Sequence, residues 1–212
     1  MFEIFLFVNP IGIYCYDTEL LIKQATNELN IDTCFNYIPI TNTKVISADI
    51  VRRRKDGQKL TDISKYSMAS FQTLRIYHAI KLEYGNKKAR AYIVELQQAL
   101  NVNFNLYSEN LQQKIAKKLN LDFKKINNPK ADKYIDKSIK QDMDLADKMN
   151  VRNTPTTIIY NESGNYNGIL LEGTVAHDKL INVLKHDSCF IENFEEETKN
   201  CNLRKTNHLR LI

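Results

Sequence analysis

The hydrophobic positions of the chain change period several times, and each change marks a different expected element. Residues 2–8 form an aromatic and β-branched run that ends at Asn-Pro, which predicts a buried strand. Residues 18–29 repeat apolar side chains every three or four positions, which predicts a helix with one buried face. Residues 33–40 alternate and predict a second strand. The chain therefore opens as strand, helix, strand.

Helical periodicity dominates the middle of the chain. Residues 41–64 have no clear period, so we expect a mobile loop there. Ser108 is placed to cap one of the later helices, and His78 lies on the apolar stripe of another, where we expect a packed side chain. Four helical segments are predicted, over residues 71–82, 89–100, 111–119 and 135–149.

The last part of the chain returns to β structure. Residues 156–160 are rich in β-forming side chains, and Ser163-Gly164-Asn165 predicts a hairpin turn into a strand over residues 166–171. Residues 177–185 have one apolar helical face. The pattern predicts an α/β fold with a core at residues 1–64 and 151–186, an inserted helical subdomain at residues 65–150 and a polar tail at residues 187–212.

Composition narrows the class of protein. With 43% hydrophobic and 26% charged residues, the chain resembles an ordinary globular protein, and it has no apolar run near the ~20 residues of a membrane span. Its acidic start, Met1-Phe2-Glu3, does not fit a secretory signal, so we expect a cytoplasmic protein. The net charge of +5 predicts no nucleic-acid partner. The basic run at residues 52–55 is expected in a solvated loop, with an acidic protein partner as the alternative.

The cysteines form no Cys-x-x-Cys pair, and in a reducing compartment we expect free thiols. We expect Cys15 and Cys34 to be small core residues. Neither His186 with Cys189 nor Cys201 with His208 fits a zinc site, so we expect no metal and no cofactor.

Two motifs connect this pattern with a known family. The first is Phe-Val-Asn-Pro-Ile-Gly-Ile-Tyr-Cys-Tyr at residues 7–16, and the second is Val-Arg-Asn-Thr-Pro-Thr at residues 151–156. They resemble the DsbA-type thioredoxin fold, in which a strand, a proline and Cys-x-x-Cys precede a helix, and a Thr-Pro loop with a cis proline faces the active site. The resemblance implies a degenerate active-site motif, which consists of Gly12, Ile13, Tyr14 and Cys15. It also implies a cis-proline loop, which consists of Thr154 and Pro155.

The missing first cysteine decides the expected chemistry. In such motifs the first thiolate attacks, activated by the start of the helix, and here that position is Gly12. Cys15 stands at the resolving position, where it can form no disulfide within the motif. We therefore expect no dithiol exchange and no catalytic residue.

Within the superfamily the chain is similar to the SpxH (YjbH) branch. That resemblance implies an adaptor that presents an Spx-type transcriptional regulator to the ClpXP protease in stress responses, with protein partners and no membrane attachment. The alternative is a DsbA-family monothiol or glutathione-linked oxidoreductase, transferase or isomerase. Against it, Gly12 offers no side chain to activate a bound thiol.

Overall fold

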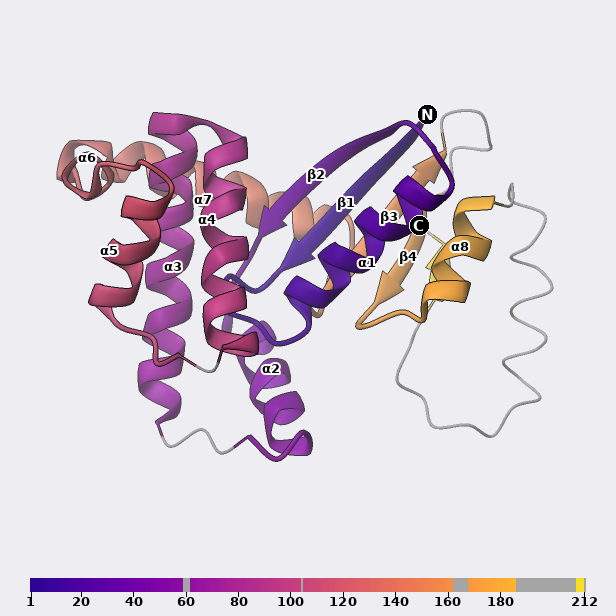
Figure 1. Ribbon diagram of the computed structural model, residues 1–212, viewed down its shortest axis with the longest axis horizontal. Coiled ribbons are helices and arrows are strands. Elements are labelled where there is room, and N and C mark those ends of the chain that lie inside the picture. The colour runs from indigo at the N-terminus through magenta and orange to yellow at the C-terminus, as the bar shows by residue number, and fades with distance from the viewer. Residues whose placement is uncertain (59–61, 104, 162–167, 186–208, 212) are drawn as a thin grey trace. The chain divides into compact units, whose positions relative to one another are not determined.

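The computed structural model describes residues 1–58, 62–103, 105–161, 168–185 and 209–211 (Figure 1). By its internal contacts the chain divides into two compact units. The sheet unit consists of Met1–Leu6, Asp17–Tyr37 and Pro155–Ile212, and the helical unit consists of Phe7–Tyr16 and Ile38–Thr154.

Along the chain, the helices α2 to α7 lie between two groups of elements of the sheet unit. In chain order they are β1 (Phe2–Val8), α1 (Cys15–Glu28), β2 (Thr33–Pro39), α2 (Thr43–Lys55), α3 (Ile63–Tyr84), α4 (Asn86–Gln97), the π-helix η1 (Gln98–Val102), α5 (Glu109–Lys118), α6 (Phe123–Ile126), the 3₁₀ turn η2 (Pro129–Ala131), α7 (Asp132–Lys148), β3 (Thr156–Asn161), β4 (Ile169–Glu172), α8 (His177–Lys185) and β5 (Leu209–Leu211). The strands and helices predicted at both ends of the chain are confirmed, with shifts of a few residues at their ends.

The sheet has the strand order β2-β1-β3-β4-β5 among the described residues. β3 and β4 are antiparallel, with Thr156 opposite Glu172 and Ile159 opposite Ile169, as expected for a hairpin. The predicted turn Ser163-Gly164-Asn165 lies outside the described residues. Within the segment predicted as a polar tail, residues 209–211 pair with β4 as β5. A three-residue strand is too short to show a period in the sequence.

The core of the sheet unit is made of aliphatic side chains from the strands and from α1 and α8. In Figure 1 α1 crosses in front of the strands, and α8, in orange, lies beside β4. The alternation within the strands and the helical spacing within α1 place these side chains inside. Each is at most 2% exposed: Ile4, Leu6, Ile22, Ile158, Leu170 and Leu180.

The helical unit is built around α3 and α4, whose aromatic and aliphatic side chains form its core. Gly85 separates the two helices with φ +83°, a left-handed conformation that suits glycine. The cap predicted at Ser108 is confirmed, because its hydroxyl accepts the N–H of Leu111 at 3.2 Å. His78 is buried as predicted, and its Nδ1 lies 2.9 Å from Ser138 Oγ. The fully buried core includes Tyr77, Ile80, Tyr92, Ile93 and Leu96.

The mobile loop expected over residues 41–64 is wrong, because much of it is the helix α2. Asn42 caps this helix by accepting the N–H of Val45 at 2.9 Å. The inward face of α2 combines aliphatic side chains with buried Asp49 and Arg53, so its apolar period is interrupted. The basic run at residues 52–55 is the last turn of α2 and not a solvated loop.

No helix in the described part of the chain is long and apolar enough to cross a membrane. The division into a core at residues 1–64 and 151–186, an inserted subdomain and a tail stays a prediction. By contacts, residues 38–64 group with the helices that follow them.

Candidate functional site

Residues 9–15 join β1 to α1 and form the segment that we call the motif loop. Gly12 is buried, and its N–H donates to the carbonyl of Asn9 at 2.9 Å. A Cβ atom at Gly12 would lie 2.8 Å from Asn9 Cβ and 2.9 Å from Cys15 Sγ. The position of Gly12 is therefore closely surrounded, and its nearest neighbours include the thiol of Cys15.

Cys15 is the first residue of α1 and has no exposed surface. Burial, and next the negative charge of Asp49, raises the pKa of Cys15 to about 12. At neutral pH the thiol is therefore protonated, whereas the thiolate is the form that attacks disulfides. The expectation that Cys15 is a buried core residue is confirmed.

Tyr14 has an unusual backbone conformation, with φ 66°. Non-glycine residues rarely adopt positive φ, and those that do often lie at functional sites. The Tyr14 hydroxyl donates to the carboxylate of Asp56, which follows α2. Burial, and next this hydrogen bond, raises the pKa of Tyr14 to about 12. The loop conformation is thus held by a contact with the end of α2.

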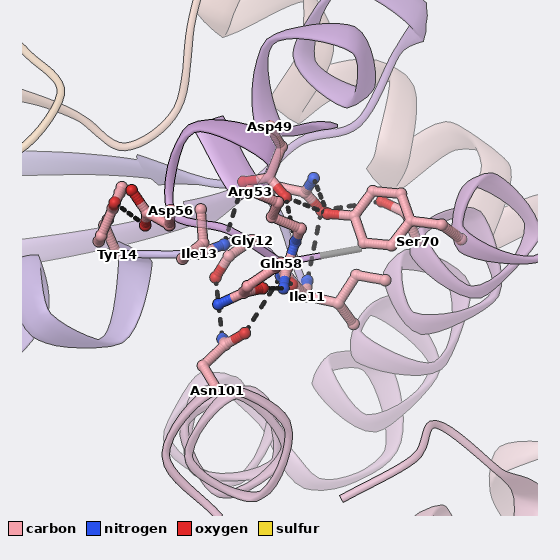
Figure 2. A network of polar contacts seen from close by, with 12 residues as sticks. Ile11, Gly12, Ile13, Tyr14, Asp49, Arg53, Asp56, Gln58, Ser70 and Asn101 are labelled. Carbon is pink, nitrogen blue, oxygen red and sulfur yellow. Dashed lines mark hydrogen bonds and ion pairs between the residues drawn. The ribbon is translucent and has the colours of Figure 1, made fainter. Parts of the chain in front are cut away.

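A buried ion pair on α2 fixes the centre of the motif loop (Figure 2). Asp49 Oδ1 accepts the backbone N–H of Ile13 at 3.0 Å, while its Oδ2 accepts Arg53 Nε at 2.8 Å. Asp49 has no exposed surface and Arg53 is 8% exposed. Burying two charges is costly unless their remaining hydrogen-bonding atoms are also paired.

Arg53 makes three further hydrogen bonds, one of them to the motif loop. Its Nη2 donates to the carbonyl of Ile11 at 2.7 Å and to Asn101 Oδ1 at 3.1 Å, and its Nη1 donates to Gln58 Oε1 at 2.9 Å. Asn101 Nδ2 in turn donates to the carbonyl of Gly12 at 3.1 Å. Asn101 belongs to the π-helix η1, and π turns inside helices frequently occur at functional sites.

Tyr66 on α3 completes the network. Its hydroxyl donates to Asp49, and Arg53 lies over its ring at 5.2 Å from the centroid. Asn9 Nδ2 donates to the Tyr66 hydroxyl at 3.3 Å, and Ser70 Oγ donates to Asn9 Oδ1 at 2.8 Å. Burial, and next the charge of Asp49, raises the pKa of Tyr66 well above its ordinary value. We call Asp49, Arg53 and Tyr66 the clamp.

The clamp defines what the motif loop can do. The carbonyls of Ile11 and Gly12 and the N–H of Ile13 are all occupied by side chains of the helical unit. Gln97 Nε2 also donates to the carbonyl of Asn9 at 3.0 Å. The loop therefore presents neither an attacking thiolate nor these backbone groups to a substrate, and the arrangement does not support dithiol exchange.

Along the chain, Thr154 is the last residue of the helical unit and Pro155 begins the last segment of the sheet unit. Both residues are buried, and the N–H of Gly173 donates to the carbonyl of Pro155 at 2.8 Å. Thr154 Oγ1 is buried and has no hydrogen-bond partner among the described residues. The cis form of this bond and the approach of Pro155 to the helix that carries Cys15 stay predictions.

Cys34 corrects one expectation, because this residue of β2 is exposed and not part of the core. Cys34 lies near the start of β2, where no side chain is fully buried, whereas Tyr37, Ile38 and Pro39 at the end of the strand are buried. Cys189 and Cys201 lie outside the described residues. No group of three or more His, Cys, Asp or Glu side chains within the described ranges is arranged to hold a metal ion.

The sequence motif located the loop but not the clamp. The side chains that hold the loop come from α2 and α3, at sequence separations that no local pattern connects. One local signal did exist, since Asp49 and Arg53 have the i, i+4 spacing of an ion pair on a helix.

These features define a protein of the thioredoxin fold. The sequence profile described as Thioredoxin matches residues 5–182, and the chain belongs to this family. A comparison with curated protein sequences finds no match. The predicted DsbA-type thioredoxin fold is confirmed.

Solved structures show the same fold at low identity. The chain is similar to a putative protein disulfide isomerase from Nitrosomonas europaea, with 12% identity, a TM-score of 0.57 and coverage of 86% of this chain and 95% of that one. It is similar to the catalytic domain of Proteus mirabilis ScsC, with 16% identity, a TM-score of 0.57 and coverage of 87% and 81%. It is also similar to the thiol-disulfide exchange protein α-DsbA2 from Wolbachia pipientis, with 17% identity, a TM-score of 0.54 and coverage of 87% and 82%.

Proposed function

We propose that this protein binds other proteins and has no dithiol exchange activity. The observation that carries the proposal is the state of Cys15, which is fully buried with a pKa raised to about 12, while Gly12 stands where the family resemblance implies the attacking cysteine. The clamp holds the loop through groups that contribute no thiol chemistry. A fold kept without its catalytic group retains binding as its simplest use.

The specific function that we propose is that of a cytoplasmic adaptor. It would present an Spx-type transcriptional regulator to the ClpXP protease, as the resemblance of its motifs to the SpxH (YjbH) branch implies. An adaptor raises the local concentration of its client at the protease, so modest interfaces with each partner suffice. Neither a cofactor nor a nucleic acid is needed for this role.

Isothermal titration calorimetry with a purified Spx-type regulator tests the proposal. We expect direct binding, retained within a factor of about two in Cys15→Ala, because the buried thiol has no part in it. Absence of binding to the regulator would contradict the adaptor role, whereas loss of binding in a folded Cys15→Ala variant would indicate a thiol-dependent contact.

The alternative is a monothiol or glutathione-linked enzyme, and the names of the similar structures motivate testing it. We expect no reduction of insulin with dithiothreitol as the electron donor. We also expect no rise in melting temperature with millimolar glutathione, although a ligand at 100 times its Kd would stabilise the fold by about 2.7 kcal/mol. Insulin reduction that is lost in Cys15→Ser would establish the enzyme.

A further inference from the structure

A second candidate surface lies at one end of the helical unit, where four helix ends meet. Figure 1 shows the end of α3, the start of α4, the end of α5 and the short α6 gathered there. Three contacts hold this junction together: Lys88 Nζ donates to the carbonyl of Leu119 at 2.6 Å, Tyr84 Oη accepts the N–H of Asp122 at 3.0 Å, and Lys125 pairs with Glu83 at 3.7 Å.

Lysines concentrate at this junction, which we call the basic end. Its acidic side chains are fewer, and Lys118 pairs at 2.6 Å with Glu95, which lies towards the other end of α4. Three of the lysines, Lys87, Lys117 and Lys124, are exposed and form no ion pair within the described residues. The basic end consists of Lys87, Lys88, Lys117, Lys118, Lys124 and Lys125, with Glu83 and Asp122 among them.

Helix stability does not account for all of these lysines. Lys117 and Lys118 lie in the last turn of α5, where a positive charge is favourable. Lys87 and Lys88, however, lie in the first turn of α4, where the helix dipole disfavours positive charge. That turn contains no acidic residue, and its N-cap residue forms no side-chain hydrogen bond. Lys88 is compensated by the Leu119 carbonyl, but Lys87 has no such contact.

The basic end is separate from the motif loop. Gln97, the last residue of α4, contacts the loop through the carbonyls of Asn9 and Pro10, whereas Lys87 lies at the opposite end of the same helix. A helix of 12 residues is about 18 Å long. A partner at the basic end would therefore occupy a surface of its own, whether or not the motif loop binds a client.

We infer that the basic end is a docking surface for an acidic polypeptide segment of a protein partner. Unpaired, exposed lysines on neighbouring helix ends match a run of carboxylates in charge, and exposed charges act mainly through attraction and the rate of encounter. The acidic side chains Glu83 and Asp122 among them would repel a continuous phosphate backbone more than a peptide whose charges are spaced. An acidic segment is therefore favoured over nucleic acid.

Fluorescence anisotropy with a labelled 12-residue Glu-Ala peptide tests the inference on the full chain. In 50 mM NaCl the triple variant Lys87→Gln/Lys117→Gln/Lys124→Gln should bind about tenfold more weakly than wild type, and 300 mM NaCl should weaken the wild type more than the variant. The control Lys137→Gln/Lys140→Gln/Lys148→Gln removes the same charge from exposed positions of α7 and should change the Kd less than twofold. Lys124→Glu alone should weaken binding about threefold.

Three results would overturn the inference. Equal losses in the triple variant and its control would show a general effect of net charge. An unchanged affinity for the peptide in the triple variant, with a wild-type melting temperature, would show that the peptide does not bind at the basic end. Tighter binding of a 12-nucleotide single-stranded RNA through the same lysines would assign the surface to nucleic acid. None of these results depends on binding or degradation of an Spx-type regulator, so failure here is distinct from failure of the adaptor role.

Discussion

Asp49 accepts a hydrogen bond from the backbone N–H of Ile13 at 3.0 Å, although the two residues are 36 positions apart in the sequence. The same carboxylate pairs with Arg53, which in turn contacts the carbonyl of Ile11. Helix α2 thus supplies to the motif loop both an acceptor and a donor. The loop is fixed by a buried polar network and not by a disulfide.

Removing the charge of Asp49 should destabilise the fold strongly. In Asp49→Asn the guanidinium of Arg53 stays buried without its counterion, which typically costs about 3–5 kcal/mol. Urea denaturation of the wild type and the variant measures this difference in the free energy of unfolding. The control Asp144→Asn, on the exposed face of α7, should change it by less than about 0.5 kcal/mol. Equal midpoints for the two variants would show that the clamp does not hold the loop.

The motif loop should still be able to form a disulfide. A Cβ at Gly12 would lie 2.9 Å from Cys15 Sγ, close to the ~3.0 Å between a Cβ and the far sulfur of a normal disulfide. We therefore expect Gly12→Cys to form a bond with Cys15 under mild oxidation, seen by peptide mass spectrometry as a loss of two hydrogens. Gly12→Ala, which cannot form this bond, should be destabilised by about 1–3 kcal/mol through crowding. Two free thiols in oxidised Gly12→Cys would contradict the geometry.

The two described cysteines should differ sharply in reactivity. Cys34 is exposed, whereas Cys15 is fully buried with a pKa raised to about 12 by burial and by Asp49. In a Cys189→Ser/Cys201→Ser background, iodoacetamide at pH 8 should label only Cys34 in the native protein and both thiols in guanidinium chloride. Mass spectrometry of the digested peptides measures the ratio. Rapid labelling of Cys15 in the native protein would contradict its burial and would favour the alternative of a monothiol enzyme.

The free energy of unfolding should fall in acid through His78. Burial, and next the charge of Lys81, lowers the pKa of His78 to about 3, while an unfolded histidine titrates near 6.5. As the pH falls below 6.5 the unfolded chain takes up this proton first, so stability is lost down to about pH 3, by about 3 kcal/mol at pH 4. Burial also raises the pKa of Asp142. As the pH falls, this carboxylate therefore binds a proton in the folded protein before it does so in the unfolded chain, which offsets part of the loss of stability.

Urea midpoints from pH 7 to pH 4 for wild type and His78→Gln test this linkage. The variant has no imidazole to titrate, so its stability should decline less steeply with falling pH. Parallel profiles for the two proteins would mean that His78 does not control the acid sensitivity.

The sequence was most informative where one apolar period continued through a whole element. The strand at residues 2–8 and the helix at residues 177–185 were predicted because their buried positions are all apolar. Helix α2 was missed because Asp49 and Arg53 occupy its inward face and interrupt the apolar stripe. Their charges are buried only because α2 meets the motif loop, a relationship that local spacing does not reveal.

The candidate site likewise contains some residues that the sequence predicted and others that it did not. Gly12 and Cys15 were located by their place in a motif, and the burial of Cys15 followed from the ordinary preference of cysteine. The contacts of Tyr66 and Asn101 with the site depend on how α3 and the π-helix η1 pack against the motif loop. No sequence pattern near these two residues predicts that packing. The exposure of Cys34 depends on which end of β2 is covered, and that depends on the tertiary fold.

Degradation of an Spx-type regulator by purified ClpXP is the most direct test of the central claim, that this thioredoxin-fold protein acts by binding and not by thiol chemistry. The initial rate of degradation should rise with the concentration of added protein and saturate, and Cys15→Ala should give the same curve within about twofold. A rate that stays unchanged across the concentration series, with a matched regulator and active ClpXP, would contradict the account.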